Sequence, residues 1–342
     1  MAKRASFPRR ETGVRLVLGA ALVAAVELAS PAPAHATEAE QVTLEEDSSA
    51  QAPKPKPEPA SEDEPKVKRN VARYSLPWEL RPVLPVNLAR LDNTFAFYGV
   101  GGTTIVEQAS ASYKVIQRLA ILAKLTVAND APPNGPGAFG FANPLIGAQA
   151  GFWPAKSLKL GLFLGFTLPV GMGGGAPADP GQVEAIHAAM LARSGFDNPL
   201  FMPDYLTTWP GIDIAYVTHG FTVQAETSVA LMGRVRGPYN ERNANADFTL
   251  GLHAGYFIFP WWSAGLDLRY ERWLTTPAFI NAENDPSGDL RDVATAEVGA
   301  RFHVKVTDDI TWRPGLSMAF GIDDPMAGAS YKVVHVDLPF QF

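Results

Sequence analysis

The sequence predicts an all-β protein: a closed antiparallel transmembrane β-barrel of about twelve strands, with short periplasmic turns and long external loops. Three observations predict this fold. Between Val71 and Phe342, stretches of about ten residues alternate apolar and polar side chains, as barrel strands do. The connections between these stretches alternate in length. The last stretch ends on an aromatic residue, Phe342.

The alternation places the start of each candidate strand to within a few residues. The strands are expected to begin near Asp92, Thr104, Leu119, Pro144, Leu158, Thr208, Phe221, Ala246, Trp262, Asp292, Ile310 and Tyr331. Short connections fall at 116–118, 154–157, 218–220, 260–261 and 307–309. Long connections fall at 129–143, 171–206, 236–245, 274–291 and 323–330. An even number of strands puts both barrel ends on the periplasmic side.

The N-terminal part has a different composition. Residues 1–36 combine a basic start, an apolar run and a small-residue cleavage site, which predicts a secretory signal peptide. Residues 37–70 are rich in Pro, Glu and Lys and contain no aromatic residue, which predicts a disordered periplasmic linker. Residues 71–342 form the barrel with a short lead-in, in the bacterial outer membrane. Tyr74–Pro85 is too proline-rich for a strand and is a candidate plug of the periplasmic mouth.

Composition excludes several kinds of function. The chain has no cysteine, so it offers neither disulfides nor thiol chemistry. Its net charge of −6 provides no basic surface for nucleic acid. No cofactor-binding motif is present, and no cofactor is expected.

Each strand has a predicted lipid face and a predicted inner face. In the strand from Trp262, the outward positions run aromatic, aliphatic, aromatic to Tyr270, as a lipid face between two aromatic belts does. Phe163, on an inner face, suggests a partly filled lumen. Nine inner charges are candidate pore-lining residues: Lys124, Asp213, Glu226, Asp267, Arg269, Glu271, Glu297, Arg301 and Arg313. They fit either a salt-bridged closed interior or a selective pore.

Catalytic and metal sites have weak sequence support. No barrel histidine shows the His-x-Ser spacing of outer-membrane phospholipases, although a triad assembled across strands stays open. His253, His303 and His335 fall on the inner face, where polar filling is a simpler role than metal binding. We therefore predict no enzyme activity and no metal ligand.

The connection 171–206 contains a predicted helix. Asp179 and Pro180 suit the N-cap and first helical position. Val183, Ile186, Met190 and Leu191 share one face of a helix that runs through Arg193. Such a loop can cap the barrel, fold into it or bind a partner, and the sequence leaves these three open.

The final strand carries apolar residues at alternate positions from Val334 to Phe342. In this it resembles bacterial outer-membrane β-barrels as a class. The resemblance implies recognition by the barrel-assembly machinery, with Phe340 and Phe342 as the assembly signal. Pro339 departs from the pattern because it cannot donate a ladder hydrogen bond.

A second resemblance covers residues 141–175 only. This segment has an Asn143-Pro144 start, a short turn, and a Leu-rich strand closing on Leu168-Pro-x-Gly171. It looks like the MetA-pathway phenol-degradation-like group of outer-membrane proteins. The resemblance implies uptake of small, rather apolar compounds.

The leading functional hypothesis is a channel for passive or facilitated diffusion of small solutes. The alternatives are a closed structural or receptor barrel acting through its external loops, and a lipid-acting hydrolase. The expected partners are outer-membrane lipid, the assembly machinery and a small-molecule solute. The sequence makes no prediction about the oligomeric state.

Overall fold

The computed structural model describes residues 73–97, 101–194, 196–237, 242–280, 291–323, 326–327 and 330–342. The predicted signal peptide (1–36) and linker (37–70) lie outside these residues and stay predictions. No helix among the described residues is long and apolar enough to cross a membrane.

Strands make up most of the part of the chain that the structure describes. Their bounds are β1 (Leu88–Phe97), β2 (Thr103–Ile116), β3 (Leu119–Ala131), β4 (Ala138–Phe141), β5 (Leu145–Phe152), β6 (Leu158–Thr167), β7 (Tyr205–Thr218), β8 (Phe221–Arg234), β9 (Ala244–Phe259), β10 (Trp262–Trp273), β11 (Asp292–Phe302), β12 (Val304–Lys305), β13 (Thr311–Trp312), β14 (Gly315–Gly321) and β15 (Lys332–Gln341). The connection between β6 and β7 contains the helix α2 (Pro180–Ala192) and the short 3₁₀ helix η1 (Asn198–Phe201).

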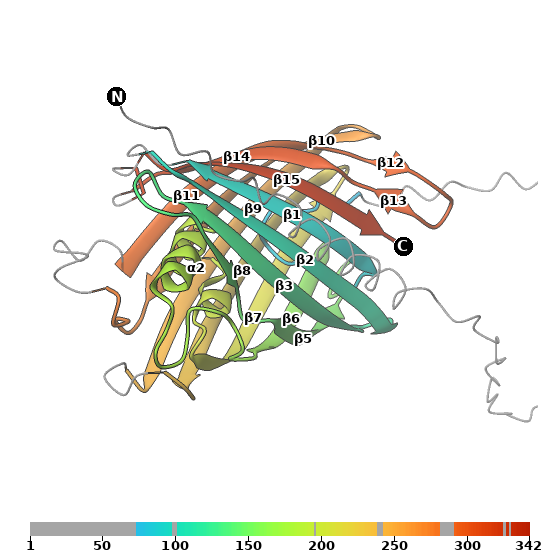
Figure 1. Cartoon of the computed structure of the whole chain (residues 1–342). Helices are drawn as coiled ribbons and strands as arrows, with labels where there is room; N and C mark the ends of the chain where they lie inside the picture. Colours follow the sequence, from blue (N-terminus) through green and yellow to red (C-terminus); the bar gives the residue numbers. More distant parts are fainter. Residues whose placement is uncertain are drawn as a thin grey trace, which may run out of the picture. The chain divides into compact units, whose positions relative to one another are not determined.

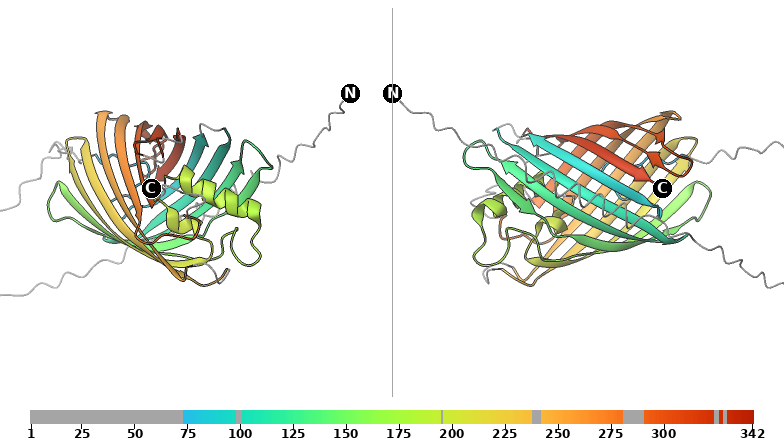
Figure 2. Two further views of the ribbon diagram at one scale, coloured as in Figure 1. Left: turned by 90° about the vertical axis from the view of Figure 1, so that its left-hand side faces the viewer. Right: turned by 45° about the vertical axis from the view of Figure 1, so that its right-hand side comes forward.

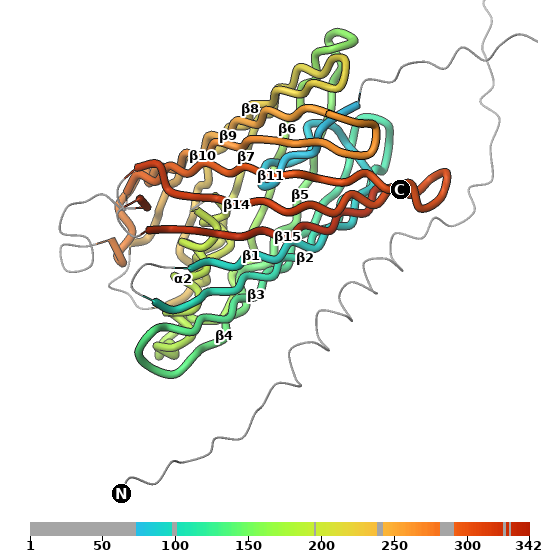
Figure 3. The backbone as a smooth tube through the Cα atoms, turned by 90° about the horizontal axis from the view of Figure 1, so that it is seen from above, coloured from blue at the N-terminus to red at the C-terminus, as the bar shows by residue number. Residues whose placement is uncertain are grey.

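The sheet closes on itself. Neighbouring strands follow the order β1-β2-β3-β5-β6-β7-β8-β9-β10-β11-β14-β15, which gives twelve barrel strands. β1 also pairs with β15, antiparallel, from Leu88 opposite Gln341 to Phe97 opposite Lys332 (Figures 1 and 3). The predicted closed antiparallel barrel of twelve strands is confirmed. A closed wall leaves no unpaired edge, which is what crossing a bilayer with strands requires.

The structure refines one prediction at the start of the barrel and contradicts another. β1 begins at Leu88, a few residues before the expected start near Asp92, and Leu88 already pairs with Ser112. The predicted loop 129–143 is largely a hairpin, since β3 continues to Ala131 and pairs with β4. Only 132–137 are free to form the turn.

Proline interrupts the ladder in two places. Between β4 and β5, the backbone N–H of Asn143 donates to Leu200 O of the β6–β7 connection at 2.7 Å, and Pro144 has no N–H to donate. The strand predicted near Ile310 begins instead as the two-residue β13 and resumes as β14 after Pro314. Such interruptions cannot be seen in the alternation of the sequence, because the side chains still alternate across them.

The outer face of the wall is apolar. Many of the large side chains exposed on the strands are aliphatic, among them Leu162, Leu164 and Leu268. At the end that carries the short turns, Trp261 stacks on Phe259 and Phe302, with ring centroids 5.4 and 6.1 Å apart. An apolar band edged by aromatic rings is the surface that a bilayer and its interface favour.

Two segments fill the inside of the barrel. Residues 73–87, here called the N-terminal plug, lie among the inward side chains of the wall. The β6–β7 loop (residues 168–204) brings α2 against β4, β3 and β2 at the end that carries the long loops (Figure 2). Of the three roles left open for this loop, the structure shows it folded into the barrel.

Candidate functional site

The N-terminal plug uses its backbone to bind the barrel wall. It lacks a ladder partner, so its N–H groups need other acceptors. Three of them donate to inward side chains: Ser75 N to Thr222 Oγ1 at 2.9 Å, Trp78 N to Asp267 Oδ2 at 3.0 Å, and Arg81 N to Glu226 Oε2 at 2.8 Å. The predicted plug in 74–85 therefore exists as a lumenal segment held by wall carboxylates and a hydroxyl.

Inner-face glycines give the plug its space. A Cβ on Gly315 would lie 2.4 Å from the Trp78 ring, and one on Gly299 would lie 2.6 Å from it. A Cβ on Gly251 would come within 2.9 Å of Leu80. Glycine inside a strand marks a close approach by another segment. These glycines were a signal for the plug that sequence reasoning missed.

The side chain of Arg81 also holds the plug to the barrel wall. Its guanidinium lies 2.5 Å from Glu226 Oε1 and sits 4.0 Å from the centre of the Phe163 ring. Trp209 contributes a second ring at 5.4 Å. Phe163 and Trp209 also contact each other edge to face. The filled lumen that Phe163 suggested is thus confirmed, and the filling is an arginine of the plug.

The helix of the β6–β7 loop forms as predicted. The Asp179 side chain accepts from Gln182 N at 3.1 Å, and Pro180 occupies the first turn. The buried face includes Ile186 and Met190, whereas Leu191, which was predicted to share that face, is 37% exposed. The Cγ1 and Cδ1 atoms of Ile186 lie so close to Gly140 of β4 that a Cβ there would be 2.8 Å away. The helix is therefore seated against the wall.

Arg193, at the C-cap of α2, joins the loop to the plug and the wall. Its guanidinium is bonded to Glu79 of the plug, to Asp92 of β1 at 3.0 Å and to Asp197 at 3.0 Å. Its side chain is 1% exposed. Sequence reasoning placed Arg193 at the end of a helix but gave no indication of this contact, because its partners lie more than a hundred residues away in Glu79 and Asp92.

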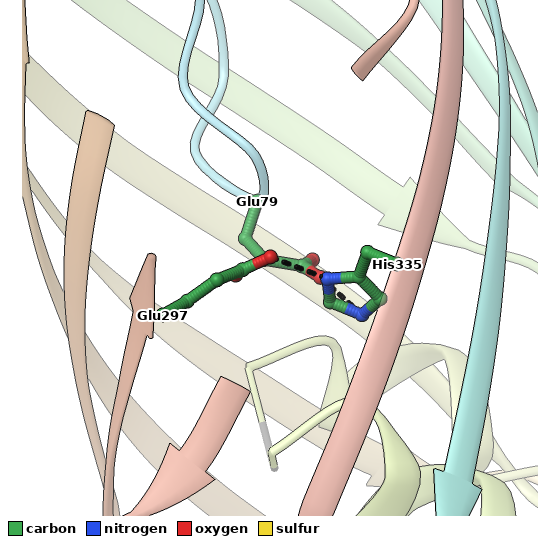
Figure 4. A group of neighbouring side chains, drawn as sticks. All are labelled: Glu79, Glu297 and His335. Carbon is green, nitrogen blue, oxygen red and sulfur yellow. Dashed lines mark hydrogen bonds and ion pairs between the residues drawn. The ribbon is translucent and has the colours of Figure 1, made fainter. Parts of the chain in front are cut away.

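Glu79 also belongs to a carboxylate–imidazole group. His335 Nδ1 lies 2.6 Å from Glu297 Oε1, and His335 Nε2 lies 3.2 Å from Glu79 Oε1 (Figure 4). Among the described residues, these are the three side chains with grouped metal-ligating atoms, all within 4.8 Å of one another. Arg269 lies 3.3 Å from Glu79 and 3.2 Å from Glu297. Arg193 and Arg269 already neutralise the two carboxylates, so the group is a buried ionic network.

The nine predicted inner charges all lie on the inner face, and most are paired. Lys124 contacts Asp197 at 3.0 Å. Burial raises the pKa of the Asp197 carboxyl, but Lys124 and Arg193 lower it by more, so this pKa lies well below its ordinary value. Five of the others pair with an acidic or basic side chain: Glu226 with Arg81, Asp267 with His253, Glu297 with Arg269, which also pairs with Glu79, and Arg301 with Asp337. The remaining three have hydrogen bonds: Asp213 accepts from Gln224, Glu271 accepts from Asn198, and Arg313 donates to Tyr74 O.

Two cavities border strands β2 and β3. One of about 60 Å³ lies between the plug and the inner faces of β1–β3, and its lining includes Gln108, Ser110, Ser112 and Lys124. A second, of about 710 Å³, lies between α2 and the long-loop ends of β2 and β3. The space beside β2 and β3 is therefore not fully packed, and Arg193 lines the smaller of the two cavities.

A serine–histidine pair does occur across strands. Ser263 Oγ lies 2.8 Å from His303 Nε2. The described charged groups that act on His303 are Arg313, Arg301 and Arg73, all positive. A general base in a hydrolase needs a neighbour that favours the imidazolium, and three arginines oppose it. The charges around this pair therefore oppose the imidazolium that a hydrolytic triad has to stabilise.

Fold and site together define a class: a closed barrel of the outer-membrane type whose lumen is occupied by two segments of its own chain. No family model matches this chain, and no curated protein matches it. Among solved structures, the chain is similar to the KdgM porin, at a TM-score of 0.42 and 9% identity, over 74% of this chain and 99% of that one. The chain is also similar to the NanC porin, at a TM-score of 0.43 and 6% identity, over 74% of this chain and 100% of that one.

A third similarity is to the translocator domain of the autotransporter NalP from Neisseria meningitidis, at a TM-score of 0.41 and 10% identity, over 75% of this chain and 86% of that one. All three are barrel proteins. At these identities and TM-scores, no solute or mechanism carries over to this chain. The barrel described above stands on its own strand pairing.

Proposed function

We propose that this chain is an outer-membrane channel for passive or facilitated diffusion of small solutes, closed in this structure by the N-terminal plug and the β6–β7 loop. The contact between Arg193 and Glu79 carries the proposal. It joins the N-terminal plug to the β6–β7 loop, and neither segment belongs to the strand ladder that closes the wall. One of them can therefore move while the twelve strands stay paired.

The proposed route follows the inner faces of β1, β2 and β3. Its short-turn half is the cavity lined by Ser110, Ser112 and Gln108. Its long-loop half is the larger cavity beside α2. The barrier between them consists of Arg193 with its carboxylate partners and the Lys124–Asp197 ion pair. Movement of the β6–β7 loop removes both halves of this barrier.

The predicted pore-lining residues have a place in this proposal. Lys124 faces the route directly, since it lines the cavity beside the plug. The remaining eight surround space that the plug and the loop occupy, so they would line a path only when those segments move. Both signs of charge are present, and the selectivity of the open state is a matter for measurement.

The location we propose is the bacterial outer membrane, with outer-membrane lipid around the apolar wall and the N-terminal linker in the periplasm. The exposed apolar band and the aromatic residues at the short-turn end support it. The predicted signal peptide supports export. The resemblance of residues 141–175 to the MetA-pathway phenol-degradation-like group favours a small, rather apolar solute, and this stays a prediction.

Single-channel recording of the refolded mature protein tests the proposal. We expect discrete conductance steps separated by long closed periods, because the closed arrangement has many buried ion pairs to break. Bilayers exposed to the refolding detergent alone serve as the control. Folded, heat-modifiable protein that gives no steps at any applied voltage would contradict the channel.

The second candidate function, a closed structural or receptor barrel, is favoured by the same buried ion pairs. A closed barrel predicts no conductance steps for the wild-type chain, and none for variants in which the β6–β7 loop has been freed. The channel proposal predicts that freeing the loop increases conduction. The two functions are therefore separable with one pair of proteins.

The proposed assembly signal makes a further prediction. Phe340 points outward, 37% exposed, and stacks on Trp312, and the N–H of Phe342 donates to Asn87 O. Deleting Phe342 and replacing Phe340 with Ala is expected to lower the amount of heat-modifiable barrel in outer membranes several-fold. Replacing Gln341 with Ala is the control. Unchanged assembly of the double variant would argue that these residues only contact lipid.

A further inference from the structure

Two carboxyl groups in the long-loop half of the barrel face each other without a cation. Asp247 is near the start of β9 and Glu271 near the end of β10, and they are 0% and 1% exposed. Asp247 lies opposite Trp273, and Glu271 opposite Thr249, so the two are diagonal neighbours on the inner face. Each carboxyl acts directly on the other.

Asn198 completes this group. It is the first residue of η1, and its Nδ2 donates to Glu271 Oε1 at 2.8 Å. Its own Oδ1 is buried and has no hydrogen-bond partner, and both carboxylate oxygens of Asp247 are buried without a hydrogen bond of good geometry, although Glu271 and Asn198 lie close enough to act on that carboxyl. Three buried oxygens from two residues are thus left unsatisfied at one place. Buried polar atoms without partners are rare and costly.

Two other groups of buried carboxylates in the described lumen have their own cations. Arg81 neutralises Glu226 beside Asp213, and Arg193 and Arg269 neutralise Glu79 and Glu297. The Asp247–Glu271 pair differs, because no lysine, arginine or histidine of the described residues forms an ion pair with either carboxyl, and the nearby Asp292 that acts on Glu271 is itself acidic.

The internal segments outside the described residues also contain no lysine, arginine or histidine in the sequence. These segments are 98–100, 195, 238–241, 281–290, 324–325 and 328–329. The candidates for the positive charge at this pair are a proton and a metal ion.

We propose that Asp247, Glu271 and Asn198 form a binding site for a hard divalent cation, Ca²⁺ being the best match. All the available donors are carboxylate or amide oxygens, which Ca²⁺ prefers. No cysteine or histidine is among them, which disfavours zinc and other soft metals. A half-turn of the Asn198 carboxamide presents Oδ1 in place of the amide nitrogen that now donates to Glu271.

The cation would connect moving and fixed parts of the molecule. Asn198 belongs to the β6–β7 loop, whereas Asp247 and Glu271 belong to the wall. A bound ion therefore fastens the loop to β9 and β10, at a second point beside the Arg193 contact. This consequence for closure rests on the proposed channel function, while the binding site itself does not.

Terbium luminescence tests the site directly, because Tb³⁺ occupies calcium sites and is excited by a nearby indole. Trp273, buried and directly opposite Asp247, is the donor. The full mature chain, refolded without divalent ions, is expected to give sensitised Tb³⁺ emission that excess Ca²⁺ removes. The double variant Asp247→Asn with Glu271→Gln is expected to lose it. Trp273→Phe is expected to lose the emission but keep Ca²⁺ binding.

Thermal unfolding gives an independent readout. Ligand that binds only the folded state raises the unfolding midpoint, so Ca²⁺ is expected to raise it for the wild type and not for the double variant. Asp213→Asn is the matched control, because it alters a buried carboxyl pair that already has Arg81. This variant should keep the full Ca²⁺ response.

The competing outcome is a proton shared between the two carboxyls. Then neither Tb³⁺ emission nor a Ca²⁺-dependent midpoint would be seen, and the wild type would show an infrared band of a protonated carboxyl that Asp247→Asn removes. This result would overturn the cation site. It would leave the channel proposal untouched, because conductance of the wild type is measured separately.

Discussion

Replacing Arg193 with Met is expected to free the β6–β7 loop and to turn a mostly closed barrel into a conducting one. The substitution keeps much of the side-chain volume but leaves Glu79, Asp92 and Asp197 without their shared cation. Removing one partner of a buried ion pair costs about 3–5 kcal/mol. Since 1.4 kcal/mol is a factor of ten, the equilibrium for loop release shifts by at least roughly a hundredfold.

Planar-bilayer recording measures this shift as the fraction of time spent in the open state. Arg272→Met is the matched control, because Arg272 pairs with Asp292 at 3.0 Å with both side chains more than a third exposed. That variant should behave as the wild type does. If the folded Arg193→Met barrel is open for no larger a fraction of time than the wild type, the loop is not the barrier. That result would favour the closed structural barrel.

Replacing Gly315 with Val is expected to expel the N-terminal plug. The Cβ atom alone would lie 2.4 Å from the Trp78 ring, and both the ring and the wall strand are too rigid to yield. Losing the burial of one tryptophan costs about 3–5 kcal/mol. A glutamate-specific protease is expected to cleave the variant after Glu79 in the folded barrel, whereas Glu79 of the wild type is buried and resists.

The control for this experiment is Gly233→Val, because a Cβ at Gly233 has nothing within 4 Å. A second comparison isolates the contact itself. In a chain that already carries Trp78→Ala, the Gly315→Val substitution should add little, since the ring it collides with is absent. Equal protease resistance of Gly315→Val and the wild type would mean that the plug is held without Trp78.

Features that repeat along the chain could be predicted from the sequence. Alternation identified the wall strands and placed residues such as Glu297 and Arg301 on the inner face. The helix through Arg193 could also be predicted, because an Asp-Pro start and an apolar face are local signals. The break at Pro144 could not, since it depends on which segment lies alongside.

The candidate site was harder to predict for the same reason. Inner charges look alike whether they face water or a plug, and the difference lies in partners far along the chain. Glu79, in a proline-rich lead-in, carries no local sign that it meets Arg193 and His335. The glycines opposite Trp78 were the one usable signal, because a strand has no need of glycine on a face that only meets water.

Closure of the wall has a consequence for how the protein folds. The pairing of β1 with β15 joins residues as far apart as Leu88 and Gln341, so the last strand must be available before the barrel can close. Contacts of such long sequence separation make folding slow. The plug precedes β1 directly, and its partners Thr222, Glu226 and Asp267 lie in the second half of the chain. Seating of the plug is therefore a late event that follows synthesis of β8 and β10, and the incomplete barrel exposes unpaired edges and buried charges until then.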